Sequence, residues 1–212
     1  MRKLFACTLI VTLIAATAGY WFWAQQREVG HYLSDLRIEL TLNDGVNHDR
    51  GNLLGIEPDL SPRDYQSLDL VRLKLAAYLD KARDAGLLND KTIVVLPEHI
   101  GTWLVFRGEK NELYQAANLA QAMDWLVRSN PLAFASAWLR AEGDSRANDA
   151  HLRMKARSMA RDYQTLFGGL AKEYGVTLVA GSIALPEPRI ENGKLLPGSG
   201  PLYNSSIVFG RD

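Results

Sequence analysis

Ile93-Val94-Val95-Leu96-Pro97-Glu98 is the stretch of sequence that decides the fold. An unbroken run of aliphatic side chains is typical of a strand buried on both faces, as in α/β proteins. Pro97 ends the run and a carboxylate follows it at once. Because α/β folds place ligands and catalytic groups at the carboxyl ends of such strands, Glu98 is the first candidate for a functional acid.

The segment before this strand predicts a strand–helix–strand unit. Residues 52–56 form a short apolar run, and Ser61 followed by Pro62 is typical of a helix start. Apolar side chains then recur at helical spacing over residues 64–85, and Gly86 ends the pattern. Such a unit implies two parallel strands joined by a right-handed crossover.

The rest of the chain predicts further helices and two more strands. We expect a loop at 101–108, helices over 113–127 and about 152–174, a short helix or packed segment at 132–139, and strands over 177–184 and 202–209. The turn-rich connection between the last two strands favours antiparallel pairing. The sequence therefore predicts an α/β domain.

The N-terminal segment predicts a membrane anchor. Residues 4–26 carry no charged side chain, and a helix of roughly 20 apolar residues crosses a hydrocarbon core. Tyr20, Trp21 and Trp23 lie at its far end, as in an interfacial aromatic belt. Two basic residues precede the span, so we expect a single-pass protein whose domain lies on the extracytoplasmic (periplasmic) side.

A cleaved signal peptide is the alternative, because Ala16-Thr17-Ala18 fits the small-x-small rule; the protein would then be periplasmic or secreted. We favour the uncleaved anchor because apolar and aromatic residues continue to Trp23. The expected organisation is a cytoplasmic end at 1–3, a transmembrane helix at 4–24, a stem at 25–51 with a short strand near 37–42, and a domain at 52–212.

Composition argues against several functions. The formal net charge is zero and basic residues form no stripe with aromatics, so no nucleic-acid partner is expected. The single cysteine, Cys7, lies in the apolar N-terminal segment and allows no intramolecular disulfide. His99 has no second histidine four residues on and no cysteine cluster, so no metal site is expected. Surface positions are expected for His31, His48, His151, Lys110 and Lys194.

Three segments together resemble the carbon–nitrogen hydrolase (nitrilase/amidase) superfamily. They are the strand 93–98 ending in Pro-Glu, the helix–Tyr-Gly–strand–Gly-Ser passage 170–182, and the Tyr-Asn strand 202–209. Each segment is weakly specific, and their order and spacing carry the resemblance. It covers residues 52–212 and implies part of a nitrilase-like α-β-β-α sandwich preceded by one transmembrane helix.

The resemblance implies a chemistry. That family cleaves or transfers at a non-peptide C–N bond through a cysteine thioester, using a Glu–Lys–Cys triad and no cofactor. Only Glu98 maps onto this chain, as the general base, and we expect its surroundings at the strand end to be dry. The family's lysine and cysteine lie beyond the Tyr-Asn strand, so the chain is expected to be a truncated, amino-terminal portion. Cys7 lies near the inner end of the span and does not fit the nucleophile.

The implied partners are a small-molecule amide or nitrile, the membrane through residues 4–24, and a possible second copy in a homo-oligomer. Trp103 and Phe106 are candidate substrate contacts, with Trp125 as a third aromatic that could line the pocket. Two alternatives stay open: a non-catalytic binding protein on a partial scaffold, and a remote relative of the lipoprotein N-acyltransferases. In the first, Glu98 is only a strand-end cap or ion-pair partner.

Overall fold

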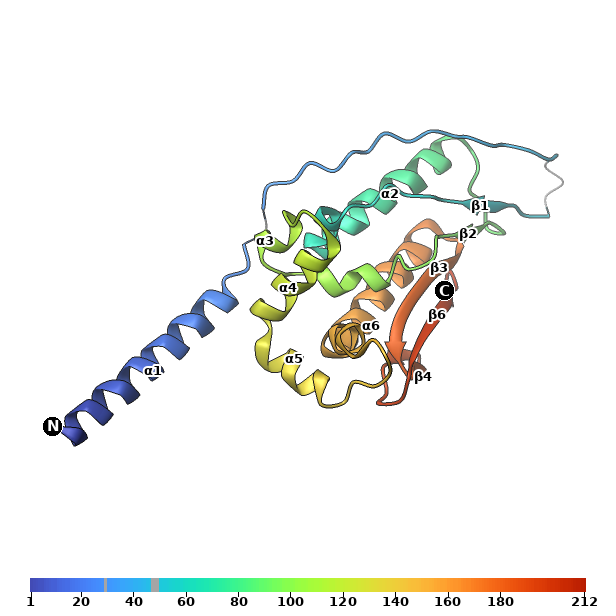
Figure 1. The fold of residues 1–212 in the computed structure, drawn as a ribbon. Coiled ribbons are helices and arrows are strands. Elements are labelled where there is room, and N and C mark those ends of the chain that lie inside the picture. Colours follow the sequence, from blue (N-terminus) through green and yellow to red (C-terminus); the bar gives the residue numbers. More distant parts are fainter. Residues whose placement is uncertain (29, 47–49) are drawn as a thin grey trace.

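The structure, a computed structural model, describes residues 1–28, 30–46 and 50–212 (Figure 1). It is a mixed α/β fold with a four-stranded sheet, helices packed on one side of it, and a long N-terminal helix that projects away from the domain (Figure 1). The expected surface position of His48 falls outside the described residues.

The sheet contains the strands that the sequence predicts. Its order is β1 (Leu53–Gly55), β2 (Ile93–Val95), β3 (Thr177–Pro186) and β6 (Leu202–Phe209). The first three strands are parallel, and β6 pairs antiparallel with β3. Both the parallel β1–β2 pair and the antiparallel β3–β6 pair were expected and are confirmed.

The crossover between β1 and β2 is helical but divided. A 3-10 turn, η1 (Pro62–Gln66), begins at Ser61, whose backbone N–H and hydroxyl both donate to the Asp64 carboxylate. Ser67 is extended and its hydroxyl accepts from the Leu70 N–H, so it caps a second helix, α2 (Leu68–Asp84). The predicted continuous helix over 64–85 is therefore wrong in its first turn, because a second cap interrupts it.

The middle of the chain is a series of short helices: η2 (Thr102–Phe106), α3 (Asn111–Tyr114), α4 (Leu119–Ser129) and α5 (Pro131–Trp138). The helix expected over 113–127 is two helices, because the Asn118 side chain accepts from the Gln121 N–H and caps α4. The loop expected at 101–108 contains η2. The short helix expected at 132–139 is confirmed as α5.

Helix α6 (Arg146–Tyr174) supplies most of the layer that packs on β3. Tyr163, Phe167 and Leu170 lie on its buried face, as the helical spacing predicts. Gly175 ends the helix in the left-handed conformation at φ 63°. The connection from β3 to β6 contains a small hairpin, β4 (Arg189–Glu191) with β5 (Lys194–Leu196).

The other face of the sheet is uncovered among the described residues. Leu53, Ile93 and Val208 are all exposed there. The described residues therefore place one helical layer on the four-stranded sheet, with the β4–β5 hairpin as a separate two-stranded sheet. The short strand expected near 37–42 is absent: this part of the stem is extended and forms no ladder.

Helix α1 (Arg2–Gln25) is the one helix in the described part of the chain that is long and apolar enough to cross a membrane. It leaves the domain at the end formed by α3, α4 and α5 (Figure 1). Of its residues only Ala24 is buried.

Candidate functional site

The three segments that carry the family resemblance meet at the end of β2. The loop Pro97–Gly101 follows β2, Gly181 and Ser182 lie on the neighbouring strand β3, and Asn204 lies on β6. Hydrogen bonds join the loop both to Ser182 of β3 and to Asn204 of β6. Residues more than 100 positions apart in the sequence therefore form one site.

A bulge in β3 gives the loop room to approach. The β3–β6 register shifts between Val179 and Ser182, and Gly181 has φ 66°. A Cβ atom on Gly181 would lie 2.1 Å from the Pro97 carbonyl oxygen. Only glycine fits this conformation and this close backbone contact.

Ser182 then fixes the loop. Its hydroxyl accepts a hydrogen bond from the His99 N–H at 2.7 Å, and its carbonyl accepts one from the Gly101 N–H at 2.9 Å. His99 itself has φ 63°, a left-handed conformation that costs a non-glycine residue free energy. The residue next to Glu98 is thus held in a strained conformation by its neighbours, as is common at functional sites.

Glu98 is oriented by β6. The Asn204 Nδ2 donates to Glu98 Oε1 at 2.5 Å, and His99 Nε2 lies 3.6 Å from the same oxygen. The Glu98 side chain is nevertheless 67% exposed. The expectation of dry surroundings is therefore wrong, because no residue that the structure describes covers the sheet face next to the loop.

Two buried tyrosines support the site from the helical side. The Tyr65 hydroxyl donates to the Ile100 carbonyl at 2.9 Å. The Tyr163 hydroxyl donates to the Gly181 carbonyl at 3.1 Å and accepts from the Ile207 N–H at 3.4 Å. Burial raises the pKa of Tyr163 to about 12, so its hydroxyl remains a donor at neutral pH. The bulge is therefore tied to both α6 and β6.

The predicted aromatic contacts lie at different depths. Trp103 is 37% exposed and packs on Phe106, with ring centroids 5.6 Å apart. Phe106 is 0% exposed, so a direct substrate contact does not fit it, and its ring packs against that of Trp103. Trp125 lies on α4 and packs against Trp23 of α1, 6.4 Å between centroids.

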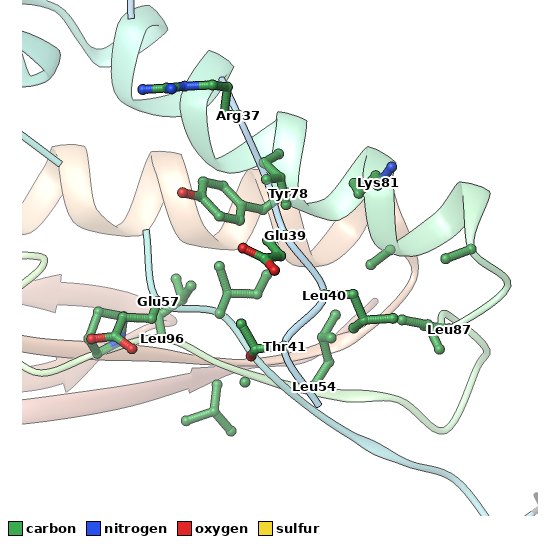
Figure 2. A pocket seen from close by; sticks show the side chains of 17 residues that line it. Arg37, Glu39, Leu40, Thr41, Leu54, Glu57, Tyr78, Lys81, Leu87 and Leu96 are labelled. Carbon is green, nitrogen blue, oxygen red and sulfur yellow. The ribbon is translucent and has the colours of Figure 1, made fainter. Parts of the chain in front are cut away.

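A cavity of about 710 Å³ lies beside the end of β2, between the stem, β1 and α2 (Figure 2). Figure 2 shows stem residues 37–41 crossing it, with Tyr78 and Lys81 of α2 opposite. Leu96 and Pro97 line the cavity, but Glu98 does not. The Glu98 carboxylate is therefore not a wall of this cavity.

Two surface predictions are wrong. His151 is buried on α6, with its ring 5.0 Å from that of Phe134. Lys110 is buried because its ammonium group donates to the Trp23 and Gln26 carbonyls at the end of α1. His31 and Lys194 are exposed as expected. No cluster of three metal-ligating side chains occurs among the residues that the structure describes.

Sequence reasoning missed the parts played by Ser182 and Asn204. Both lie in motifs that carry the resemblance, Gly-Ser and Tyr-Asn, so the signal was present, but the backbone contacts that give Ser182 its part are not visible in a sequence.

Comparison of the chain with family models, with curated proteins and with solved structures found no match. The resemblance to the carbon–nitrogen hydrolases therefore stays an expectation from the three sequence motifs.

Proposed function

We propose that the chain is the Glu-bearing part of a membrane-anchored carbon–nitrogen hydrolase with a nitrilase-like α-β-β-α sandwich, acting on a small-molecule amide or nitrile. The observation that carries the proposal is the hydrogen bond of 2.5 Å between Asn204 and Glu98. It joins the Pro-Glu and Tyr-Asn motifs, and the Gly-Ser motif holds the loop between them. Convergence of three sequence motifs at one strand end supports a common function.

In this reaction Glu98 is the general base. It takes the proton of a cysteine thiol, and the thiolate attacks the carbonyl or nitrile carbon. With an amide, the C–N bond of the adduct breaks to give a thioester, and the amine leaves with the proton that Glu98 returns. With a nitrile, addition gives a thioimidate whose nitrogen takes that proton. Asn204 positions the carboxylate by donating to one oxygen, which leaves the other oxygen for the thiol. A lysine ammonium would stabilise the charge that develops on the substrate.

The reaction also needs a catalytic lysine and a catalytic cysteine. We assign no residue among 1–212 to either role. Cys7 lies in α1, on a helix that projects away from the domain (Figure 1). The proposal therefore requires a further segment with a lysine and a cysteine next to the uncovered sheet face.

The nucleotide sequence after codon 212 is the first test. An open frame that encodes a lysine and then a cysteine in a strand supports the proposal, whereas a stop codon at that point opposes it. The complete gene product should then form an acyl-enzyme that hydroxylamine releases as a hydroxamate.

A non-catalytic binding protein is the second candidate. The observation that favours it is the exposure of Glu98, because a base for thiol chemistry is usually shielded from water. A complete gene product that binds an amide without turning it over would support this candidate.

We also propose that α1 crosses the membrane once, with Arg2 and Lys3 in the cytoplasm and the domain outside. A membrane-impermeant thiol reagent should label Ser145→Cys on intact cells in a Cys7→Ser background. Labelling of Lys3→Cys should require permeabilised cells, and the reverse pattern would refute this orientation.

A further inference from the structure

The last turns of α1 are docked on the domain. The Tyr20 hydroxyl donates to the Arg128 carbonyl at 2.5 Å, at the end of α4. Trp23 packs on Trp125 of the same helix, and Ala24 is buried. Helix α1 and helix α4 are therefore held side by side at this end of the domain.

An ionic cluster fixes this contact. Arg27, just after α1, pairs with the Glu109 carboxylate, which is fully buried and also binds Lys155 of α6. The Arg27 guanidinium donates further to the Ser129 carbonyl at 2.8 Å. Lys110 donates to two carbonyls at the end of α1 and lies 4.4 Å above the Trp23 ring. The domain therefore cannot turn freely about the end of α1.

A fixed contact sets the depth of the domain relative to a bilayer. Tyr and Trp side chains at the end of a spanning helix lie at the level of the lipid headgroups. Since Tyr20 binds the Arg128 carbonyl, the end of α4 lies at that level too. Helix α5 begins two residues after Ser129, the last residue of α4.

Helix α5 is a short apolar helix that packs on α6 and leaves most of its other side chains exposed. The run Pro131–Leu139 has no charged side chain, and in α5 itself only Ala137 is buried. Leu132 is 71% exposed and Leu139 is 81% exposed. Three arginines border this apolar run: Arg128 before it, and Arg140 and Arg146 after it, with the Arg146 guanidinium 5.2 Å from the Trp138 ring centroid.

We propose that α5 is a second membrane contact, lying in the headgroup layer of the leaflet from which α1 emerges. This inference rests on the proposed anchoring by α1. The contact of α1 with α4 indicates that a bilayer covers the exposed side of α5, because α4 and α5 form the end of the domain where α1 leaves it (Figure 1). Exposed leucines bordered by arginines match the acyl boundary and the phosphates of a lipid surface. The domain is thus held to the membrane at two places.

The test uses the full chain in nanodiscs of phosphatidylcholine and phosphatidylglycerol, with a single cysteine labelled by an environment-sensitive nitrobenzoxadiazole dye in a Cys7→Ser background. The test positions are Leu132→Cys and Leu139→Cys. The matched control is Leu53→Cys on β1, because Leu53 is 72% exposed but lies at the other end of the domain. Val11→Cys, in the middle of α1, reports on the anchor itself.

We expect lipids with a nitroxide near the headgroup to quench the dye at 132 and 139 about twofold or more, with a blue-shifted emission, while the dye at 53 is unaffected. Quenching at 11 with no difference between 132, 139 and 53 would overturn the inference and leave the anchoring intact. Lipids with a nitroxide deep in the acyl chain should quench the dye at 11, and the absence of that quenching would refute the anchoring and the inference with it. A blue shift at 132 and 139 without quenching by lipid would mean that protein covers α5, and would also overturn the inference.

Discussion

Two residues with left-handed backbone conformations decide where Glu98 stands. Gly181 lets β3 bulge towards the Pro97 carbonyl, and His99 turns the chain directly after the carboxylate. Ser182 stabilises the turn by accepting the His99 N–H. The position of Glu98 therefore depends on backbone geometry in a neighbouring strand as much as on its own sequence.

Replacing Gly181 by alanine tests this dependence. The new Cβ would lie 2.1 Å from the Pro97 oxygen and would force a strained φ, so we expect the free energy of unfolding to fall by about 3 kcal/mol or more. Urea unfolding measures the change. Gly169→Ala is the control: it lies in α6 with open space around it, and should stabilise by about 0.5–1 kcal/mol. Equal changes in the free energy of unfolding for the two variants would contradict the close contact between Gly181 and the Pro97 carbonyl.

His151 makes stability depend on pH. Burial lowers its pKa below the ordinary 6.5, and this outweighs the nearby Ala147 and Met123 carbonyls and the Asp124 carboxylate, which act the other way. The folded state therefore binds a proton less readily than the unfolded state. The free energy of unfolding should therefore be unaffected by His151 above pH 6.5. It should fall as the pH drops from 6.5 through the lowered pKa of His151 in the folded state.

Melting temperatures at pH 7.5 and pH 5 measure this effect. His151→Leu keeps an apolar contact with Phe134 and removes the titration, so the difference between the two temperatures should shrink. His31→Gln, at an exposed histidine, should leave the difference unchanged. A His151→Leu variant with the acid sensitivity of the wild type would refute the assignment.

The sequence could locate single residues but not their burial. Glu98 was found because a strand run ends directly before it. Its exposure could not be read from the sequence, because that depends on whether another layer covers the sheet. His151 and Lys110 sit in polar sequence and are buried, because α5 and the end of α1 pack over them.

At the scale of elements, the strands follow from local sequence and the helix breaks do not. The apolar runs predict the strands β1, β2, β3 and β6 and two of their pairings, β1–β2 and β3–β6, while the parallel β2–β3 pairing was not predicted. The breaks before α2 and α4 were missed because apolar side chains continue at helical spacing through them, while Ser67 and Asn118 cap new helices. A single capping bond outweighs the periodicity there.

The junction of α1 with the domain is predicted to be a stabilising element. Arg27→Ala removes one of the two cations that neutralise the buried Glu109, together with bonds to Ser129 and Asn130. We expect the free energy of unfolding to fall by about 2 kcal/mol, as for other hydrogen bonds to buried charged groups. Urea unfolding in detergent, followed by tryptophan fluorescence, measures it.

Arg37→Ala is the control for this junction. Arg37 also pairs with a carboxylate, Asp35, but its guanidinium lies in water. Its loss should leave unfolding unchanged, because exposed ion pairs contribute little. A similar fall in the free energy of unfolding in both variants would mean that Arg27 acts only through the net charge of the protein and not through its contact with Glu109.

At the scale of the whole molecule, the described residues form a helical face, a sheet face that none of them covers, and an N-terminal apolar helix. The helical face was predictable from amphipathic patterns, and the long apolar helix from the absence of charge over residues 4–26. The convergence of the three motifs was not predictable from spacing alone, because long-range strand order brings them together. The open face beside Glu98 is where the proposed function needs its remaining catalytic groups.

The measurement that bears most directly on this function is the hydrolysis of amides and nitriles by the complete gene product, comparing wild type with Glu98→Gln and with Glu191→Gln, a change at an exposed carboxylate on β4. We expect Glu98→Gln to lower kcat/KM about 100-fold or more with an unchanged melting temperature, and Glu191→Gln to retain the wild-type rate. A Glu98→Gln protein as active as the wild type would contradict the assignment of Glu98 as the base.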